Sequence, residues 1–400
     1  SSQLLGHDSD LVLHGGGNTS VKINETNIFG EEEEILYVKG SGRNLATIDT
    51  VDFTPLRLAH MKKLVELMDI SDTMLVREQQ LAMINPEAPR PSVESLLHAI
   101  IPFNWIDHTH ADAVVTLTNT PKGKKLIQNI YGDSFIIIPY VMPGFKLAQM
   151  VYEITKKVDW KQYEGMILLN HGIISFGNEA HESYKRMINA VTLAEKYLKK
   201  FSSMPKNNFK KTAPVLKQET LRKLARIRKK VSIIRGNASL ARLNNNPEAR
   251  FFSSLPNVKQ ISTRGPITSD HLIRIKPSPV YIKHKNVEKD IEDFASKYVS
   301  YFDRHTDGKQ TRLDSSPRWG VWSEEGILSF GKSPDETETI SDIVMHTVQA
   351  IQQAENMNSL NYRGWKPISE DHIFEAEYWE LQQAKLKKES QPPEFEGKIA

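Results

Sequence analysis

The sequence predicts a mixed α/β protein of α+β character, with one central sheet flanked by helices and a smaller, degenerate α/β copy after it. Short apolar runs broken by glycine-rich turns indicate strands, and longer runs with apolar residues every three or four positions indicate amphipathic helices. The two patterns are interspersed through the first half of the chain, which favours a mixed sheet. The heptapeptide at residues 171–177 then recurs, with changes, 154 residues later.

The first half of the chain supplies the elements of the predicted sheet. Glycine clusters interrupt the apolar runs of residues 11–40, as expected for strands joined by tight turns. Further strands are predicted over residues 106–115, 135–139 and 166–177. Helices are predicted near residues 55–68, 92–101, 121–131, 146–157 and 179–200. Ser92 is expected to be the N-cap of the second of these helices.

A change in composition indicates a domain boundary. Residues 196–230 hold 13 lysines and arginines against one acidic residue, Glu219. A nucleic-acid patch would need interleaved aromatic residues, and a linker leading into a basic helix explains the same pattern without them. The predicted division is a catalytic domain at 1–205, a basic linker and helix at 206–245, a partial repeat at 246–375, and a helix and linker at 376–400.

The repeat predicts a copy of the sheet without its histidines. His-Gly-Ile-Ile-Ser-Phe-Gly at 171–177 becomes Glu-Gly-Ile-Leu-Ser-Phe-Gly at 325–331, and five of the seven positions are identical. No His-x-His precedes the second heptapeptide, so the copy is expected to hold no metal. Chance similarity between two short hairpins is the alternative. The clustered polar candidates of this second domain are Asp303, His305 and Asp314.

Two histidines stand one residue apart in the stretch Asp-His-Thr-His-Ala-Asp. In a strand, alternate side chains share a face, so His108 and His110 should project together with Asp112. A polar strand end with solvated imidazoles is the alternative. His171 is the predicted third ligand, since three imidazoles with an open fourth position are typical of catalytic zinc sites. His98 is the rival third ligand, with a place at the edge of the core as its other interpretation.

Composition excludes several kinds of site and partner. The chain contains no cysteine, which rules out disulfides, thiolate ligands and cysteine nucleophiles, so any metal must bind histidine or carboxylate. The net charge of +3 favours no particular partner. No apolar run approaches the roughly 18–20 residues that span a bilayer, and no signal-peptide pattern is present. We therefore expect a cytoplasmic protein with neither a membrane nor a nucleic-acid partner.

Five motifs in this order resemble the zinc-dependent class II aldolase/adducin family: His-Gly-Gly-Gly-Asn-Thr-Ser, Val-Lys-Gly-Ser-Gly, Pro-Ser-Val-Glu, Asp-His-Thr-His-Ala-Asp and Leu-Asn-His-Gly. Within it, the chain is similar to the aldolase half of bifunctional rhamnulose-1-phosphate aldolase/short-chain dehydrogenase proteins. Residues 1–200 match the aldolase domain, and residues 377–386 and 395–400 resemble the segments that lead into the dehydrogenase. The resemblance implies a chain cut at a domain edge, with NAD binding confined to a dehydrogenase domain that the sequence lacks.

The resemblance also implies a role for each motif residue. The ligands of Zn2+, or of another divalent metal, would be His108, His110 and His171, and the catalytic carboxylate would be Glu94. The substrate phosphate would be held by Asn18, Thr19, Ser41, Gly42 and Ser92. Val93 departs from the family pattern, because a second serine often precedes the glutamate. A small phosphorylated sugar is the implied partner, and a homo-oligomer is expected.

The implied reaction is cleavage of a ketose 1-phosphate, L-rhamnulose 1-phosphate, to dihydroxyacetone phosphate and L-lactaldehyde. Zinc would stabilise the charge left on the dihydroxyacetone phosphate half, and Glu94 would move the proton. Burial is expected to raise the pKa of Glu94 toward neutrality. The alternatives are a sugar-phosphate epimerase or dehydratase on the same scaffold and a non-catalytic adducin-like interaction module. A full-length protein with a short-chain dehydrogenase domain would also be an oxidoreductase.

Overall fold

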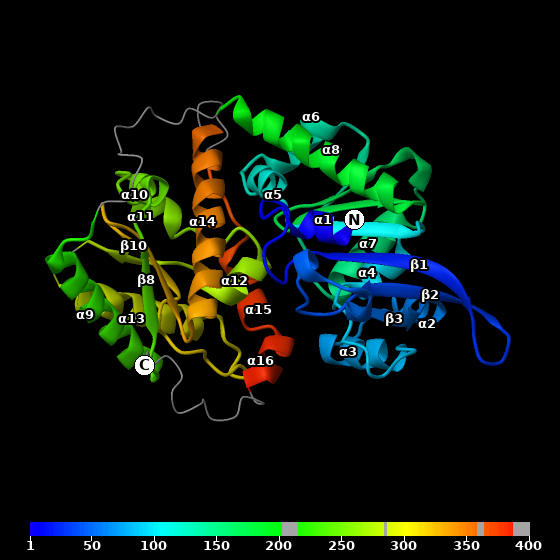
Figure 1. Ribbon diagram of the computed structural model, residues 1–400, viewed down its shortest axis with the longest axis horizontal. Helices are drawn as coiled ribbons and strands as arrows, with labels where there is room; N and C mark the ends of the chain where they lie inside the picture. Colours follow the sequence, from blue (N-terminus) through cyan, green and yellow to red (C-terminus); the bar gives the residue numbers. More distant parts are fainter. Residues whose placement is uncertain (202–214, 284–285, 358–363, 387–400) are drawn as a thin grey trace. The chain divides into compact units, whose positions relative to one another are not determined.

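The computed structural model describes residues 1–201, 215–283, 286–357 and 364–386 (Figure 1). The chain divides into two compact units, Ser1–Lys200 and Phe201–Ala400. Within the described ranges, no helix combines the length and the apolar character needed to cross a membrane.

The first unit is built on a seven-stranded mixed sheet, as predicted. Its strand order is β3-β2-β1-β4-β7-β6-β5, and all neighbours are antiparallel except the parallel pair β5 and β6. The strands are β1 (Asn18–Thr26), β2 (Glu32–Lys39), β3 (Phe53–Arg57), β4 (Trp105–Thr109), β5 (Phe135–Ile138), β6 (Gly165–Leu168) and β7 (Gly172–Gly177). β4 therefore lies at the centre of the sheet, with β1 on one side and β7 on the other.

Helices cover both faces of this sheet (Figure 1). They are α1 (Ser2–Gly6), α2 (Leu58–Leu64), α3 (Asp72–Leu81), α4 (Ser95–Ile100), α5 (Asp112–Thr118), α6 (Gly123–Tyr131), α7 (Phe145–Thr155) and α8 (Ala180–Lys199). α5, α6 and α8 contact one another and the sheet, while α4 packs between α2 and α7. An apolar core joins the sheet to α2, α4 and α7 through residues such as Leu36, Leu58, Leu97, Phe145 and Ile174. This packing anchors α4, the helix that follows Glu94.

The predicted strand over residues 106–115 is wrong in its second half. β4 ends at Thr109, and α5 begins at Asp112. Asp112 therefore does not share a strand face with the two histidines. A short apolar run such as 113–118 fits a buried helix as well as a strand, and an acidic residue in the first turn of a helix is favoured by the helix dipole.

Two further expectations differ from the structure. The segment predicted as a helix over 55–68 begins as the strand β3, whose edge position tolerates Pro55 because an edge strand can leave one side of its backbone unpaired. Ser92 is not a helix N-cap, because α4 begins at Ser95 and Glu94 occupies the N-cap position. Three helices of the first unit, α1, α3 and α5, had no counterpart in the sequence prediction.

The second unit has a four-stranded sheet in the order β8-β11-β10-β9. Its strands are β8 (Leu240–Asn244), β9 (Val280–Ile282), β10 (Trp319–Trp322) and β11 (Gly326–Gly331). Its helices are α9 (Gln218–Arg235), α10 (Pro247–Ser253), α11 (Val258–Ser262), α12 (Ser269–Ile275), α13 (Val287–His305), α14 (Pro334–Asn356), α15 (Glu370–Glu377) and α16 (Glu380–Leu386). The long helix α14 packs along β11, as α8 packs along β7 in the first unit.

The sequence repeat corresponds to a repeat of topology. The order β8-β11-β10-β9 and its strand directions match β4-β7-β6-β5 of the first sheet. Asn170 and Glu324 hold equivalent positions before β7 and β11, and both have left-handed backbones, with φ of 58° and 66°. Such a conformation is uncommon for residues other than glycine, so its recurrence supports a common origin for the two bends.

The glycines that close the two equivalent strands offer a test of this packing. A Cβ on Gly331 would lie 2.6 Å from the backbone nitrogen of Thr337, whereas the nearest atoms to a Cβ on Gly177 are Oε2 and Cβ of Glu182, at 2.7 and 2.9 Å. Gly331→Ala should therefore lower the free energy of unfolding by about 1–3 kcal/mol, because the backbone of α14 would have to move. Gly177→Ala should lower it by less, because the carboxylate of Glu182 can rotate away and its Cβ needs only a small shift. Urea unfolding of both variants measures the difference. A larger loss in Gly177→Ala would contradict this packing.

Candidate metal centre

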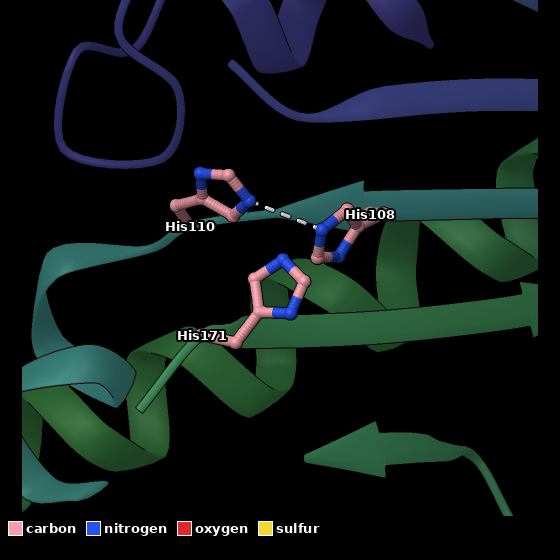
Figure 2. Close-up of side chains that lie close together, drawn as sticks. All are labelled: His108, His110 and His171. Atoms are coloured by element: carbon pink, nitrogen blue, oxygen red, sulfur yellow. Dashed lines mark hydrogen bonds between the residues drawn. The ribbon is translucent and has the colours of Figure 1, made fainter. Parts of the chain in front are cut away.

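Two of the predicted ligands lie at the end of the central strand β4. His108 is within the strand and is 0% exposed, and its Nδ1 lies 3.0 Å from the carbonyl oxygen of Ile173 on β7. Because a carbonyl can only accept, Nδ1 carries a hydrogen, and Nε2 is the ring nitrogen that faces the other histidines. His110 follows the strand, and its Nε2 lies 3.1 Å from that of His108 (Figure 2). The two imidazoles thus present nitrogens to one point.

The third histidine reaches this point from the bend between β6 and β7. The ring of His171 lies 5.1 Å from each of the other two rings, measured between centroids (Figure 2). Gly172 permits the approach, since a Cβ there would lie 2.4 Å from the carbonyl oxygen of Thr109 and 3.0 Å from the rings of His108 and His110. One ligand atom from each histidine lies within 4.8 Å of the others. The predicted convergence of the three residues is present.

The carboxylate of Glu94 faces the same cluster. Its Oε1 lies 3.3 Å from Nε2 of His171, and its Oε2 lies 3.5 Å from Nε2 of His108. The residue is 7% exposed, and among the described residues Oε1 has no hydrogen-bond partner. Three imidazole nitrogens beside a buried, incompletely bonded carboxylate are a donor set that suits a divalent transition metal.

The electrostatics of the cluster correct one expectation. Burial raises the pKa of Glu94, but His108, His171 and the hydrogen bond from Asn18 outweigh burial and lower that pKa to about 2. The predicted rise toward neutrality is therefore wrong, and Glu94 is ionised at neutral pH. Burial also lowers the pKa of His171 to about 4, which leaves its ring neutral, as a metal ligand must be.

His98, the rival ligand, lies behind the histidine cluster and bonds to residues of β1. It is fully buried, and its two ring nitrogens bond to Asn18 and Ser20 on β1. Its position is therefore in the core, and among the described residues it is not part of the histidine group that could hold a metal.

The predicted phosphate contacts fall into three places. Asn18 and Ser92 lie beside Glu94: Nδ2 of Asn18 donates to Glu94 Oε2 at 2.7 Å and lies 3.4 Å from Ser92 Oγ. Thr19 points to the opposite face of the sheet from Asn18, and its hydroxyl lies 2.7 Å from that of Ser2. Ser41 and Gly42 are exposed on the turn after β2, and their role as substrate contacts stays a prediction.

Sequence reasoning missed a buried lysine that organises this edge of the site. Lys39 is 2% exposed, and its ammonium group donates to the carbonyl oxygens of Gly15, Gly16 and Gly17 at 2.7, 3.1 and 2.6 Å. These bonds fix the glycine turn that leads directly into Asn18. The available signal was a single lysine at the end of the apolar run Ile-Leu-Tyr-Val, just before a glycine turn.

The second unit replaces all three histidines. The paired registers place Leu243, Asn245 and Glu325 at the positions of His108, His110 and His171. Two of the three predicted polar candidates of this unit, Asp314 and His305, have separate partners: Asp314 pairs with Arg318, and His305 pairs with Glu370.

Two protein-family models match the chain, one in each of its two units. The family model described as the class II aldolase and adducin N-terminal domain matches residues 2–198, and the one described as the second domain of class II aldolase matches residues 218–386. An uncharacterized oxidoreductase of Bacillus subtilis (strain 168), YuxG, is 28% identical over 416 residues. The alignment covers 100% of this chain and 59% of that relative, so the chain spans about three-fifths of the relative's length.

Solved structures are also similar to the chain. The N-terminal class II aldolase domain of a conserved protein from Thermoplasma acidophilum is 40% identical and covers 49% of this chain and 90% of that chain, with a TM-score of 0.46. A sugar-phosphate aldolase from Thermotoga maritima is 16% identical, covers 51% and 94% of the two chains, and has a TM-score of 0.37. An L-fuculose-1-phosphate aldolase from Thermus thermophilus is 16% identical, covers 51% and 95%, and has a TM-score of 0.31.

Removing one histidine tests the metal centre. A divalent ion, zinc or cobalt, should bind the metal-free protein and raise its midpoint of thermal unfolding. His171→Ala should weaken this binding by at least about 100-fold, because it removes one of three ligands. Calorimetric titration gives the affinities, and His181→Ala, which changes an exposed histidine on α8, is the control. Unchanged affinity in His171→Ala would show that the three residues do not share an ion.

Because His98 is buried in its neutral form, the stability of the unmodified protein relative to His98→Gln should depend on pH. Burial lowers the pKa of His98 from 6.5 to about 3, so below pH 6.5 the protein takes up a proton there only when it unfolds. Stability is therefore lost as the pH falls through this window. Relative to His98→Gln, the unmodified protein should lose about 1.4 kcal/mol of unfolding free energy per pH unit between pH 6 and 4.

Urea unfolding of both proteins in the presence of a chelator, at several pH values, measures this difference. A difference that stays constant with pH would mean that His98 titrates normally in the folded state.

Proposed function

Because this chain belongs to the class II aldolase/adducin family, we propose that its first unit is a zinc-dependent lyase that cleaves a ketose 1-phosphate into dihydroxyacetone phosphate and an aldehyde. The observation that carries the proposal is the convergence of His108, His110 and His171 beside the buried carboxylate of Glu94. A non-catalytic interaction module has no need of such a cluster. A carboxylate beside three imidazoles is instead the pattern of a site that moves protons next to a metal ion.

The donor set favours zinc. The chain offers three imidazoles, from the end of β4 and the bend before β7, and no thiolate, and Glu94 stands where it could approach the same ion. When bound, the ion would act as a Lewis acid for the negative charge that develops next to the substrate ketone. Nδ1 of His108 donates to a backbone carbonyl, an arrangement that orients the ring with Nε2 toward the ion.

Glu94 is assigned the proton transfer. Cleavage breaks the bond between the third and fourth carbons of the ketose, and the electron pair stays on the third carbon. Overall, one proton leaves the hydroxyl on the fourth carbon and one is added to the third carbon. Glu94 is ionised at neutral pH, so in the synthetic direction its carboxylate can remove the proton from the third carbon. In cleavage the protonated acid returns it.

The substrate is proposed to be held through its phosphate. Two glycine turns lie side by side at the edge of the site, because a Cβ on Gly15 would lie 3.4 Å from the carbonyl oxygen of Gly42. Ser41 and Gly42 are exposed there. Ser92 connects this region to Glu94, because its backbone nitrogen donates to the carbonyl oxygen of Lys39 and its hydroxyl accepts from the backbone nitrogen of Glu94. Val93, which stands where the family often has a second serine, packs against the core instead. Phosphate binding here would fix the ketose relative to Glu94. Our proposed substrate is L-rhamnulose 1-phosphate, with L-lactaldehyde as the aldehyde.

Glu94→Gln separates metal binding from proton transfer. The glutamine keeps an oxygen that accepts from Asn18 but cannot carry the proton. We expect the variant to retain zinc and to lose cleavage by about 100-fold or more. The rate is measured as release of dihydroxyacetone phosphate from L-rhamnulose 1-phosphate and from L-fuculose 1-phosphate. A coupled reaction that reduces the dihydroxyacetone phosphate monitors its release. Glu78→Gln, which alters a carboxylate that pairs with His60 on α2, is the matched control.

Cleavage by Glu94→Gln at the unmodified rate would show that another group moves the proton. If the zinc-loaded protein cleaves no ketose 1-phosphate, the aldolase proposal fails. Conversion of the same substrates to an epimeric or dehydrated sugar phosphate would then identify the alternative reaction.

A further inference from the structure

His98 links the helix that follows Glu94 to the strand that carries Asn18. It lies one turn beyond Glu94 on α4 and is 0% exposed. Its Nδ1 is 2.7 Å from the hydroxyl oxygen of Ser20, and its Nε2 makes a short hydrogen bond with Oδ1 of Asn18. Asn18 and Ser20 are alternate residues of β1 and so share one face of the strand. The imidazole therefore bonds to both residues at once.

The partners of His98 define where its hydrogen is. An amide oxygen can only accept, so Nε2 must carry the hydrogen that bonds to Asn18. In a neutral ring Nδ1 is then an acceptor, and the hydroxyl of Ser20 supplies the matching donor. Deep burial keeps the ring neutral. In this arrangement Nδ1 and Nε2 of His98, the hydroxyl of Ser20 and Oδ1 of Asn18 each have a matching hydrogen-bond partner. The other neutral tautomer would place a ring lone pair against the oxygen of Asn18.

The same bonds define the orientation of the Asn18 amide. With its oxygen held by His98, its NH2 group must point the other way, where Nδ2 donates to Oε2 of Glu94 at 2.7 Å. A flipped amide would place its carbonyl oxygen against this ionised carboxylate and would repel it. A directional chain of hydrogen bonds thus runs from Ser20 through His98 and Asn18 to Glu94.

We propose that His98 is a positioning residue that fixes the Asn18 amide with its NH2 group facing Glu94 and the three histidines. Through this amide, His98 presents a hydrogen-bond donor to the site. The donor holds the carboxylate of Glu94 in place. The catalytic consequence rests on the proposed aldolase function, whereas the orientation of the amide does not.

Two substitutions separate this role from simple packing. His98→Gln keeps an NH2 group that can donate to Asn18, while His98→Leu fills similar space without a donor. We expect His98→Leu to lower kcat for ketose 1-phosphate cleavage by about 10–100-fold, with a smaller change in KM, and His98→Gln to restore most of the loss. His271→Leu removes a buried histidine from the second unit and should leave kcat unchanged.

A spectroscopic measurement tests the orientation without relying on activity. In protein labelled with nitrogen-15 in histidine and asparagine, nuclear magnetic resonance should show the Nε2–H tautomer for His98 and a protected side-chain NH2 for Asn18. His98→Leu should lose the protected NH2 signal, and His98→Gln should keep it. The measurement on the unmodified protein needs no variant, so it decides the tautomer even if His98→Leu does not fold.

Three outcomes would overturn the inference: an Nδ1–H tautomer, an unchanged Asn18 signal in His98→Leu, or equal kcat in His98→Leu and His98→Gln when the Asn18 signals differ. Failure of the unmodified protein to cleave any ketose 1-phosphate would instead overturn the proposed function. In that case the spectra still decide whether His98 orients the amide.

Discussion

A carboxylate buried among three imidazoles is the constraint on which the first unit depends. Burying an ionised group is costly unless bonds or opposite charge compensate it. Glu94 receives one strong hydrogen bond, from Asn18, while its Oε1 lacks a hydrogen-bond partner among the described residues. A divalent cation held by the histidines would supply the missing compensation, so the charge balance of the cluster favours a bound metal.

The fold brings these groups together by close approach of its backbone. The end of β4 and the bend before β7 come near enough to share a site because Gly172 has no side chain to separate them. The second unit keeps the same strand order and the same left-handed residue before its equivalent strand, Glu324 in place of Asn170. It nevertheless has Leu243, Asn245 and Glu325 where the first unit has histidines. The bend is therefore a property of the scaffold, whereas the three histidines belong to the first of the two units.

The sequence predicted the parts of the site that are local in the chain or typical of a family, and missed those that depend on distant partners. His108, His110, His171 and Glu94 could be found from spacing and resemblance. Asp112 was misplaced because a short apolar run does not distinguish a strand from a buried helix.

The pKa of Glu94 moved opposite to the expected direction, because two of the groups that lower it come from β4 and the bend before β7. The roles of Lys39 and His98 could not be predicted either, because they also depend on partners that are distant in the chain. Their partners are the backbone of a glycine turn and the side chains of β1, which no local pattern reveals.

X-ray absorption at the zinc edge of the metal-loaded protein tests the central claim most directly, because it reports the atoms around the ion itself. The account predicts three imidazole nitrogens at about 2.0–2.1 Å, with the remaining positions filled by oxygen. A spectrum that contains fewer than three imidazoles would contradict the account, and so would one in which the ion is surrounded by oxygen alone.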